Sequence, residues 1–223
     1  TKMGHEVSVS TYGIESFLPT GLRHLYFFLK IIPSVIGSDF IFALDTFSVG
    51  FPSALAAKIF NKKIIIRTGG DFLWEGFVQR TGDLVLLRDF YTTRKDKFSL
   101  KEKVVFSITK WVLSNCSLLV FSTEWQKNIF LEPYYLHKQN IEIVENYYGE
   151  KKVVSLGVPT SKNFIAGTRP LKWKNLKFLE SIFNSEEIKA KGGILDTKNM
   201  PYEEYIKTLE EKFPNQAPGQ LQI

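Results

Sequence analysis

The stretch FIFALDTFSVGFPSALAAKIFNKKIIIRTGGD, residues 40–71, decides the fold. It opens with an apolar run at 40–45 and closes with a second at 63–68. Such nearly continuous apolar runs are typical of strands that are covered on both faces. Between them, 49–61 has helical spacing. A strand, a helix and a second strand in this order predict a parallel sheet with a right-handed crossover.

The same alternation continues on both sides of this stretch. Further strands are expected at 6–11, 118–123 and 141–146. Further helices are expected at 21–36, 100–115 and 124–130. The predicted fold class is therefore α/β, with a Rossmann-like parallel sheet and flanking helices.

The pattern changes near residue 146, where helical spacing gives way to glycine, proline and lysine. A second strand–helix–strand pattern follows at 163–168, 176–183 and 192–197. We therefore expect four parts. These are a Rossmann-like domain lacking its first strand at 1–148, a linker at 149–162, an incomplete second Rossmann-like domain at 163–213, and a loosely ordered tail at 214–223.

Composition limits the classes of binding partner and the cellular compartment that are expected for this chain. The net charge of +6 favours an anionic partner, but the lysines are dispersed along the chain, which argues against nucleic acid. A single cysteine, Cys116, fits core packing in a reducing compartment, so a cytoplasmic location is expected. The apolar segment 25–44 is interrupted by Lys30 and Asp39, which favours a helix and a strand over a membrane span.

Two cations occupy the turn GTRPLKWKN, residues 167–175, between a predicted strand and a predicted helix. Arg169 and Lys174 lie five residues apart. A helix N-terminus favours negative charge, so this turn can bind a strongly anionic group. The alternative is an ordinary solvated basic turn.

A second candidate site follows the strand at 63–68. Gly69 and Gly70 permit close approach of backbone to a ligand, Asp71 can accept a hydrogen bond from a ligand hydroxyl, and Trp74 can stack on a flat ligand face. The alternative is a glycine turn with Asp71 as a helix cap and Trp74 packed. Asp45, at the end of an earlier strand, is similarly placed.

Five segments in order resemble GT-B-fold glycosyltransferases close to family 4, and the resemblance covers most of residues 2–212. They are TKMGHEVSVST (1–11), the stretch at 40–71, VFSTEWQKNIF (120–130), IEIVENYYG (141–149) and IAGTRPLKWKNLKFLESIF (165–183). In the last of them, Arg169, Lys174 and Asn175 fit the family's spacing of arginine, lysine, and glycine or asparagine.

The resemblance implies transfer of a sugar from a nucleotide-diphosphate sugar to a saccharide or lipid-linked acceptor, with retention and with neither metal nor cofactor. Arg169 and Lys174 would then neutralise the donor diphosphate as the bond to it breaks. The acceptor-side loop would contain Gly69, Gly70, Asp71, Trp74 and Asp45. The alternative is a non-catalytic fragment or a carbohydrate-binding module.

Other chemistries have weaker support. No glycine-rich nicotinamide fingerprint follows a strand, and the three histidines lack metal-ligand spacing. The basic, amphipathic segment 94–113 has two interpretations. A solvated face is favoured, and the alternative is peripheral contact with an anionic membrane.

Overall fold

A computed structural model of the chain describes residues 4–147, 163–165, 168, 171–186, 189 and 194–196. The chain divides into two compact units. The first consists of 1–77 with 85–146, and the second of 78–84 with 147–223.

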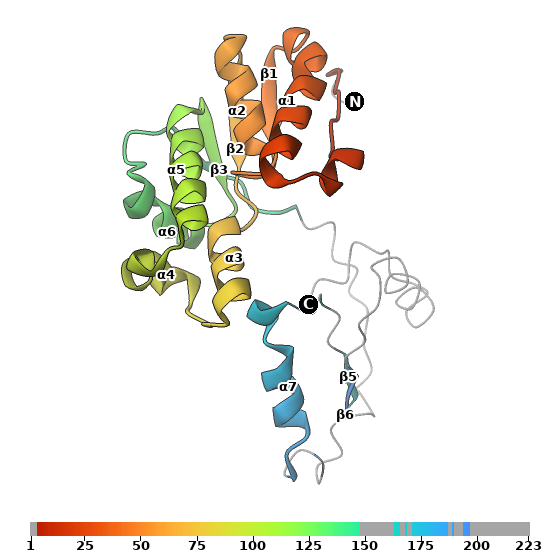
Figure 1. Ribbon diagram of the computed structural model, residues 1–223, viewed down its shortest axis with the longest axis vertical. Helices are drawn as coiled ribbons and strands as arrows, with labels where there is room; N and C mark the ends of the chain where they lie inside the picture. The colour runs from red at the N-terminus through yellow and green to blue at the C-terminus, as the bar shows by residue number, and fades with distance from the viewer. Residues whose placement is uncertain are drawn as a thin grey trace. The chain divides into compact units, whose positions relative to one another are not determined.

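The first unit is built on a four-stranded parallel sheet, so the predicted fold class is confirmed (Figure 1). In spatial order its strands are β1 (Phe40–Ala43), β2 (Lys63–Arg67), β3 (Leu118–Phe121) and β4 (Ile141–Ile143). Ile41 pairs with Ile64, and Ile66 pairs with Leu119. These four side chains therefore share one face of the sheet.

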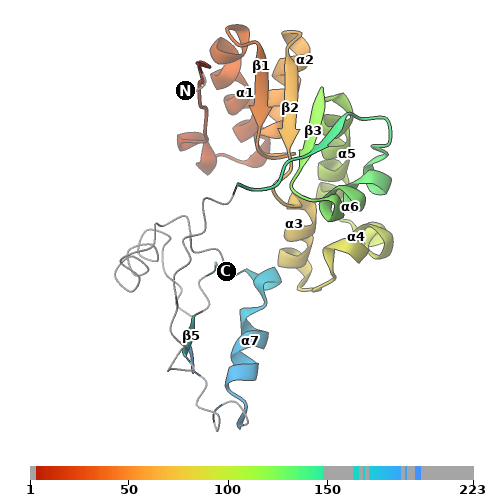
Figure 2. The ribbon, with the colours of Figure 1, turned by 180° about the vertical axis from the view of Figure 1, so that it is seen from behind.

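Helices connect the strands of this sheet. They are α1 (Thr20–Ile36), α2 (Gly50–Ile59), α3 (Phe72–Thr81), α4 (Leu87–Thr93), α5 (Leu100–Asn115) and α6 (Glu124–Tyr134), with the short 3-10 helices η1 (Ile14–Phe17) and η2 (Lys95–Lys97). Viewed from behind, β1, β2 and β3 lie in front of α2 and α5 (Figure 2). These two helices thus cover the same face of the sheet.

Two apolar clusters hold the helices of the first unit. Phe27, Ile31 and Val35 of α1 pack with Ala56 of α2. The second, here called the aromatic cluster, contains Phe77, Phe90, Tyr91, Phe98, Phe106 and Tyr134. It ties α3 and α4 to α5 and α6.

The predicted strand at 6–11 is wrong. These residues form no strand, and Val7 and Val9 are 62% and 80% exposed. Their alternation with serine has the period of a half-buried strand, but a strand is stable only where a neighbour pairs with its backbone and covers a face. The segment is instead tied to α1, since Lys30 donates a 2.8 Å hydrogen bond to the carbonyl oxygen of Thr11, 19 residues away in the chain.

The remaining predicted elements of the first unit are present, α5 with the predicted ends and the others with shifted ends. The helix predicted at 124–130 continues to Tyr134, and it ends at Tyr135, whose φ of 58° is left-handed. The helices α3 and α4 were not predicted. Among the described residues, no helix has both the length and the apolar character needed to cross a membrane.

The second unit contains a strand–helix–strand arrangement at the predicted positions. Its strands β5 (Asn163–Ile165) and β6 (Ile194–Asp196) pair in parallel, and α7 (Leu176–Phe183) lies between them in the chain. The 3-10 helix η3 (Lys172–Lys174) precedes α7. The predicted linker at 149–162 and tail at 214–223 lie outside the described residues.

Gly50, the first residue of α2, is expected to tolerate no side chain. An added methyl group would collide with the Asp45 carbonyl oxygen. We expect Gly50→Ala to lower the free energy of unfolding by about 1–3 kcal/mol in urea denaturation. The matched control is Gly76→Ala in α3, where an added methyl meets no atom within 4 Å. That variant should gain about 0.5–1 kcal/mol, and equal effects would contradict the close approach at Gly50.

Candidate functional site

The candidate site lies at the carboxyl ends of the parallel strands, where open α/β sheets bind ligands. Three connections start there. Residues 44–49 join β1 to α2, residues 68–71 join β2 to α3, and residues 122–123 join β3 to α6. The residues predicted from sequence in the first unit all lie in or next to the first two connections.

Asp45 organises its own loop. Its Oδ1 accepts hydrogen bonds from the backbone N–H groups of Phe47, Val49 and Gly50, at 2.9, 3.0 and 3.0 Å. Carboxylates are favoured at this position because the first N–H groups of a helix lack partners within it. Asp45 therefore holds the entry to α2, and the predicted contact with acceptor stays a prediction.

Gly69 and Gly70 are exposed between β2 and α3. At Gly70, an added Cβ would lie 2.9 Å from Oε1 of Glu75. The Glu75 side chain therefore lies against Gly70, where there is little room for a further side chain. Close approach of this loop to a ligand stays a prediction.

Asp71, by contrast, is buried and is 4% exposed. Its Oδ1 accepts a 2.9 Å hydrogen bond from the Trp74 backbone N–H, as in a helix cap. Its Oδ2 accepts a 2.5 Å hydrogen bond from the Tyr91 hydroxyl, which lies 2.7 Å from the Tyr134 hydroxyl. We call these three side chains the Asp71 network. They join the start of α3 to α4 and α6.

Burial sets the protonation of the Asp71 network. It raises the pKa of Asp71 to about 6, although hydrogen bonds from Tyr91 and from the backbone of Trp74 and Leu73 oppose the shift. Burial also raises the pKa values of Tyr91 and Tyr134 well above the ordinary tyrosine value. Both tyrosines therefore stay neutral and keep their hydroxyl protons at physiological pH.

The geometry around Asp71 matches the alternative interpretation of this motif, in which Asp71 caps a helix and the tryptophan is packed. The Trp74 indole Nε1 donates a 2.8 Å hydrogen bond to the Val85 carbonyl oxygen. This bond fixes the ring orientation. Asp71 thus positions the start of the helix that carries Trp74.

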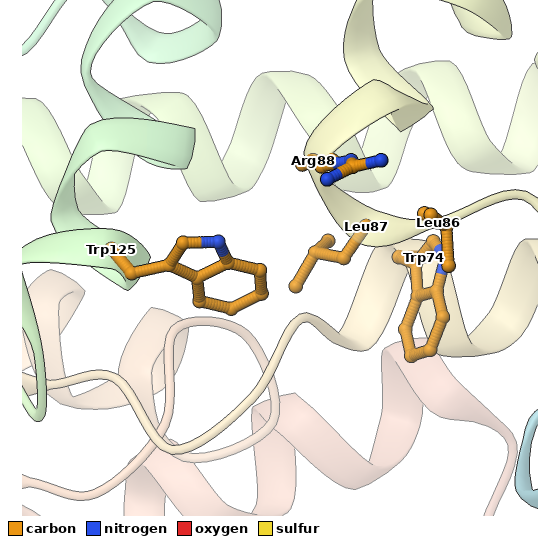
Figure 3. A pocket seen from close by; sticks show the side chains of 5 residues that line it. All are labelled: Trp74, Leu86, Leu87, Arg88 and Trp125. Atoms are coloured by element: carbon orange, nitrogen blue, oxygen red, sulfur yellow. The ribbon is translucent and has the colours of Figure 1, made fainter.

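An open pocket of about 440 Å³ lies beside this network (Figure 3). Its lining consists of Trp74, Leu86, Leu87, Arg88 and Trp125. Trp74 follows β2 and Trp125 follows β3, so both rings stand just beyond the carboxyl ends of neighbouring strands. Leu87 points toward the Trp125 ring, and the Arg88 guanidinium borders the same space (Figure 3).

Four of these pocket residues were missed from sequence: Leu86, Leu87, Arg88 and Trp125. A signal existed for Trp125, which stands in STEW directly after a predicted strand. Its neighbour Glu124, the more obvious chemical group, instead pairs with Lys127 at 2.8 Å on the surface of α6. No signal marked residues 86–88, because α4 itself was not predicted.

Of the predicted donor-side cations, Lys174 is described. It is exposed at the end of η3, with Nζ 4.4 Å from the centroid of the Trp173 ring. Asn175 follows with a left-handed φ of 51°, and α7 begins at the next residue. Arg169 lies outside the described residues.

The basic segment 94–113 forms η2 and α5. Leu100 and Val104 are 82% and 57% exposed, and Lys101 and Lys103 are exposed beside them. Contact of this face with a membrane stays a prediction.

Within the described part of the chain, no group of three or more His, Cys, Asp or Glu side chains could hold a metal ion. Burial raises the pKa of the Cys116 thiol to about 12, so the thiol is protonated and fits a packing role.

Comparison with protein-family models, with curated proteins and with solved structures finds no match to this chain.

Proposed function

We propose that the protein is a glycosyltransferase that moves a sugar from a nucleotide-diphosphate sugar to a saccharide or lipid-linked saccharide acceptor. The observation that carries the proposal is the pocket between Trp74 and Trp125 at the carboxyl edge of the parallel sheet. Flat aromatic faces pack against the apolar C–H face of a sugar ring, and open α/β sheets bind their ligands at this edge.

The first unit supplies acceptor binding in this proposal. Trp125 is 57% exposed and presents its ring to the pocket, whereas Trp74 is tied to Val85 and forms a fixed wall. The exposed backbone of Gly69 and Gly70 follows the same strand as Trp74, and its N–H and C=O groups suit sugar hydroxyls. The Asp71 network joins the start of α3, which carries Trp74, to α4 and α6.

The second unit supplies donor binding. Negative charge grows on the diphosphate as the glycosidic bond breaks, and fixed cations stabilise it most in the transition state. Lys174 stands at the start of α7, whose N-terminal N–H groups and dipole also favour an anion. With Arg169, it forms the proposed diphosphate site.

We expect Trp125→Ala to raise the acceptor KM about 10- to 100-fold, because stacking contacts of this kind contribute about 1–3 kcal/mol. Transfer is measured with UDP-, GDP- and ADP-sugars against a panel of oligosaccharide and lipid-linked acceptors. The control is Tyr147→Ala, an aromatic residue that is 89% exposed and does not line the pocket. Equal KM values for the two variants would contradict acceptor binding in this pocket.

Nucleotide binding separates transfer from simple carbohydrate binding. Calorimetry with UDP, GDP and ADP should detect one of them, and the Arg169→Ala/Lys174→Ala double variant should bind it at least about 10-fold more weakly. Saccharide binding without any nucleotide binding would favour the carbohydrate-binding alternative over the enzyme.

A further inference from the structure

We propose that the saccharide bound in the pocket is anionic, and that Arg88 binds its carboxylate or phosphate while the tryptophans pack on its ring. This inference rests on the proposed function, since it names the substrate class of the same site. Among the five lining residues, Arg88 carries the one formal charge, and the other four are leucine or tryptophan.

The position of Arg88 suits an anion at the border of the pocket. It is the second residue of α4, and Figure 3 shows Leu87 between the two tryptophan rings with the Arg88 guanidinium above Leu87. A sugar stacked on Trp125 would therefore place a ring substituent toward the guanidinium. Arginine is well matched to such a group because its planar fork binds a carboxylate or phosphate through two parallel hydrogen bonds.

The contact that Arg88 makes with its neighbour leaves most of this capacity unused. Its Nε lies 3.4 Å from Oδ2 of Asp89, and the two side chains are 65% and 50% exposed. Exposed pairs of this length contribute little. The contact engages Nε, so the two terminal nitrogens, Nη1 and Nη2, can serve a ligand.

The Arg88 side chain is 65% exposed, so its attraction to an anion is screened by salt. No lining residue is acidic, so an anionic ligand meets no like charge within the lining. With a neutral sugar, the guanidinium would gain no charged partner beyond Asp89, which its Nε already contacts at 3.4 Å.

The test compares matched oligosaccharides that differ in one terminal sugar, which is neutral, a uronate or a phosphorylated sugar. Binding of each to the full chain is measured by calorimetry at 50 mM and 500 mM NaCl. We expect the anionic ligands to bind about 10-fold or more tightly than the neutral one at low salt, with the preference shrinking at high salt. The uronate and phosphate arms identify which anion is preferred.

Variants assign this preference to Arg88. In Arg88→Gln the ratio of anionic to neutral affinity should fall to about 1, and Arg88→Lys should keep part of it, because lysine retains the charge without the fork. Lys103→Gln removes the same charge from the exposed face of α5 and should preserve the ratio. A ratio near 1 in the unmodified protein, or an unchanged ratio in Arg88→Gln, would overturn the inference.

Failure of the inference and failure of the proposed function give different results. If neutral and anionic sugars bind equally and Trp125→Ala weakens both, the pocket binds sugars and only the role of Arg88 is wrong. If no sugar binds, or if UDP, GDP or ADP binds in their place and loses affinity in Arg88→Gln, both the anionic-sugar inference and acceptor binding in this pocket are wrong.

Discussion

Raising the pH from 4 to 7 is expected to destabilise this protein by about 2.5 kcal/mol more than its Asp71→Asn variant. The effect originates in the Asp71 network, where a carboxyl group lies buried between α3, α4 and α6. Asparagine is nearly the same size and can still accept from the Trp74 N–H, but it does not titrate. The difference between the two proteins in stability against pH therefore reports the titration of the Asp71 carboxyl group.

The direction of this pH effect follows from the pKa of Asp71 in the folded protein and in the unfolded chain. Burial raises the pKa of Asp71 in the folded protein to about 6 from an ordinary value of 3.8. Between these values the unfolded chain has lost the proton while the folded protein keeps it. The stability contributed by the buried, protonated carboxyl is fully present below about pH 4 and is lost as the pH rises through about 6.

Urea unfolding at pH 4, 5, 6 and 7, followed by tryptophan fluorescence, measures this difference. The negative charge of Glu75 also contributes to raising the pKa of Asp71. The matched control is Asp39→Asn, which removes an exposed carboxyl and should leave the pH dependence of the parent unchanged. Parallel curves for the parent and Asp71→Asn would show that Asp71 titrates at its ordinary value.

The strands of the fold could be predicted from sequence because their apolar runs are nearly continuous. The burial on both faces that such runs suggest is approached by β3 and is wrong for β1, where Phe40 and Phe42 are 55% and 50% exposed. An apolar run such as 63–68 indicates a strand whichever element packs beside it, and this run forms β2. The run at 6–11 has the alternation of a half-exposed strand, which requires a neighbour that sequence alone does not supply. The helix α4 is only seven residues long, so its periodicity was too short to recognise.

The candidate site was harder to predict, because its residues gain their roles from contacts far along the chain. Asp71 was recognised as polar and well placed, but its partners Tyr91 and Tyr134 lie 20 and 63 residues away. A sequence pattern could not show that this carboxyl is buried. Arg88 and Trp74 line the same pocket, but no recognisable sequence motif contains both of them.

Phe90→Ala is expected to have the largest effect of any substitution considered, a loss of about 3–5 kcal/mol in the free energy of unfolding. Phe90 is fully buried at the centre of the aromatic cluster. Its ring centroid lies 5.2 Å from that of Phe77, 4.9 Å from that of Tyr91 and 5.3 Å from that of Phe98. Alanine would leave a cavity that three rings on different segments border, and they cannot all move in to fill it.

Two further variants, Phe90→Leu and Phe17→Ala, test whether the loss of stability comes from the cavity at Phe90 or from the removal of any phenylalanine. Leucine keeps most of the volume and should cost less than about 1.5 kcal/mol, whereas Phe17 is 90% exposed and its removal should change stability by less than about 0.5 kcal/mol. Urea denaturation of the three variants measures these differences. A small effect of Phe90→Ala, near that of Phe17→Ala, would contradict the cluster. Because α4 also carries Leu87 and Arg88, the packing of Phe90 supports the helix that provides two of the pocket residues.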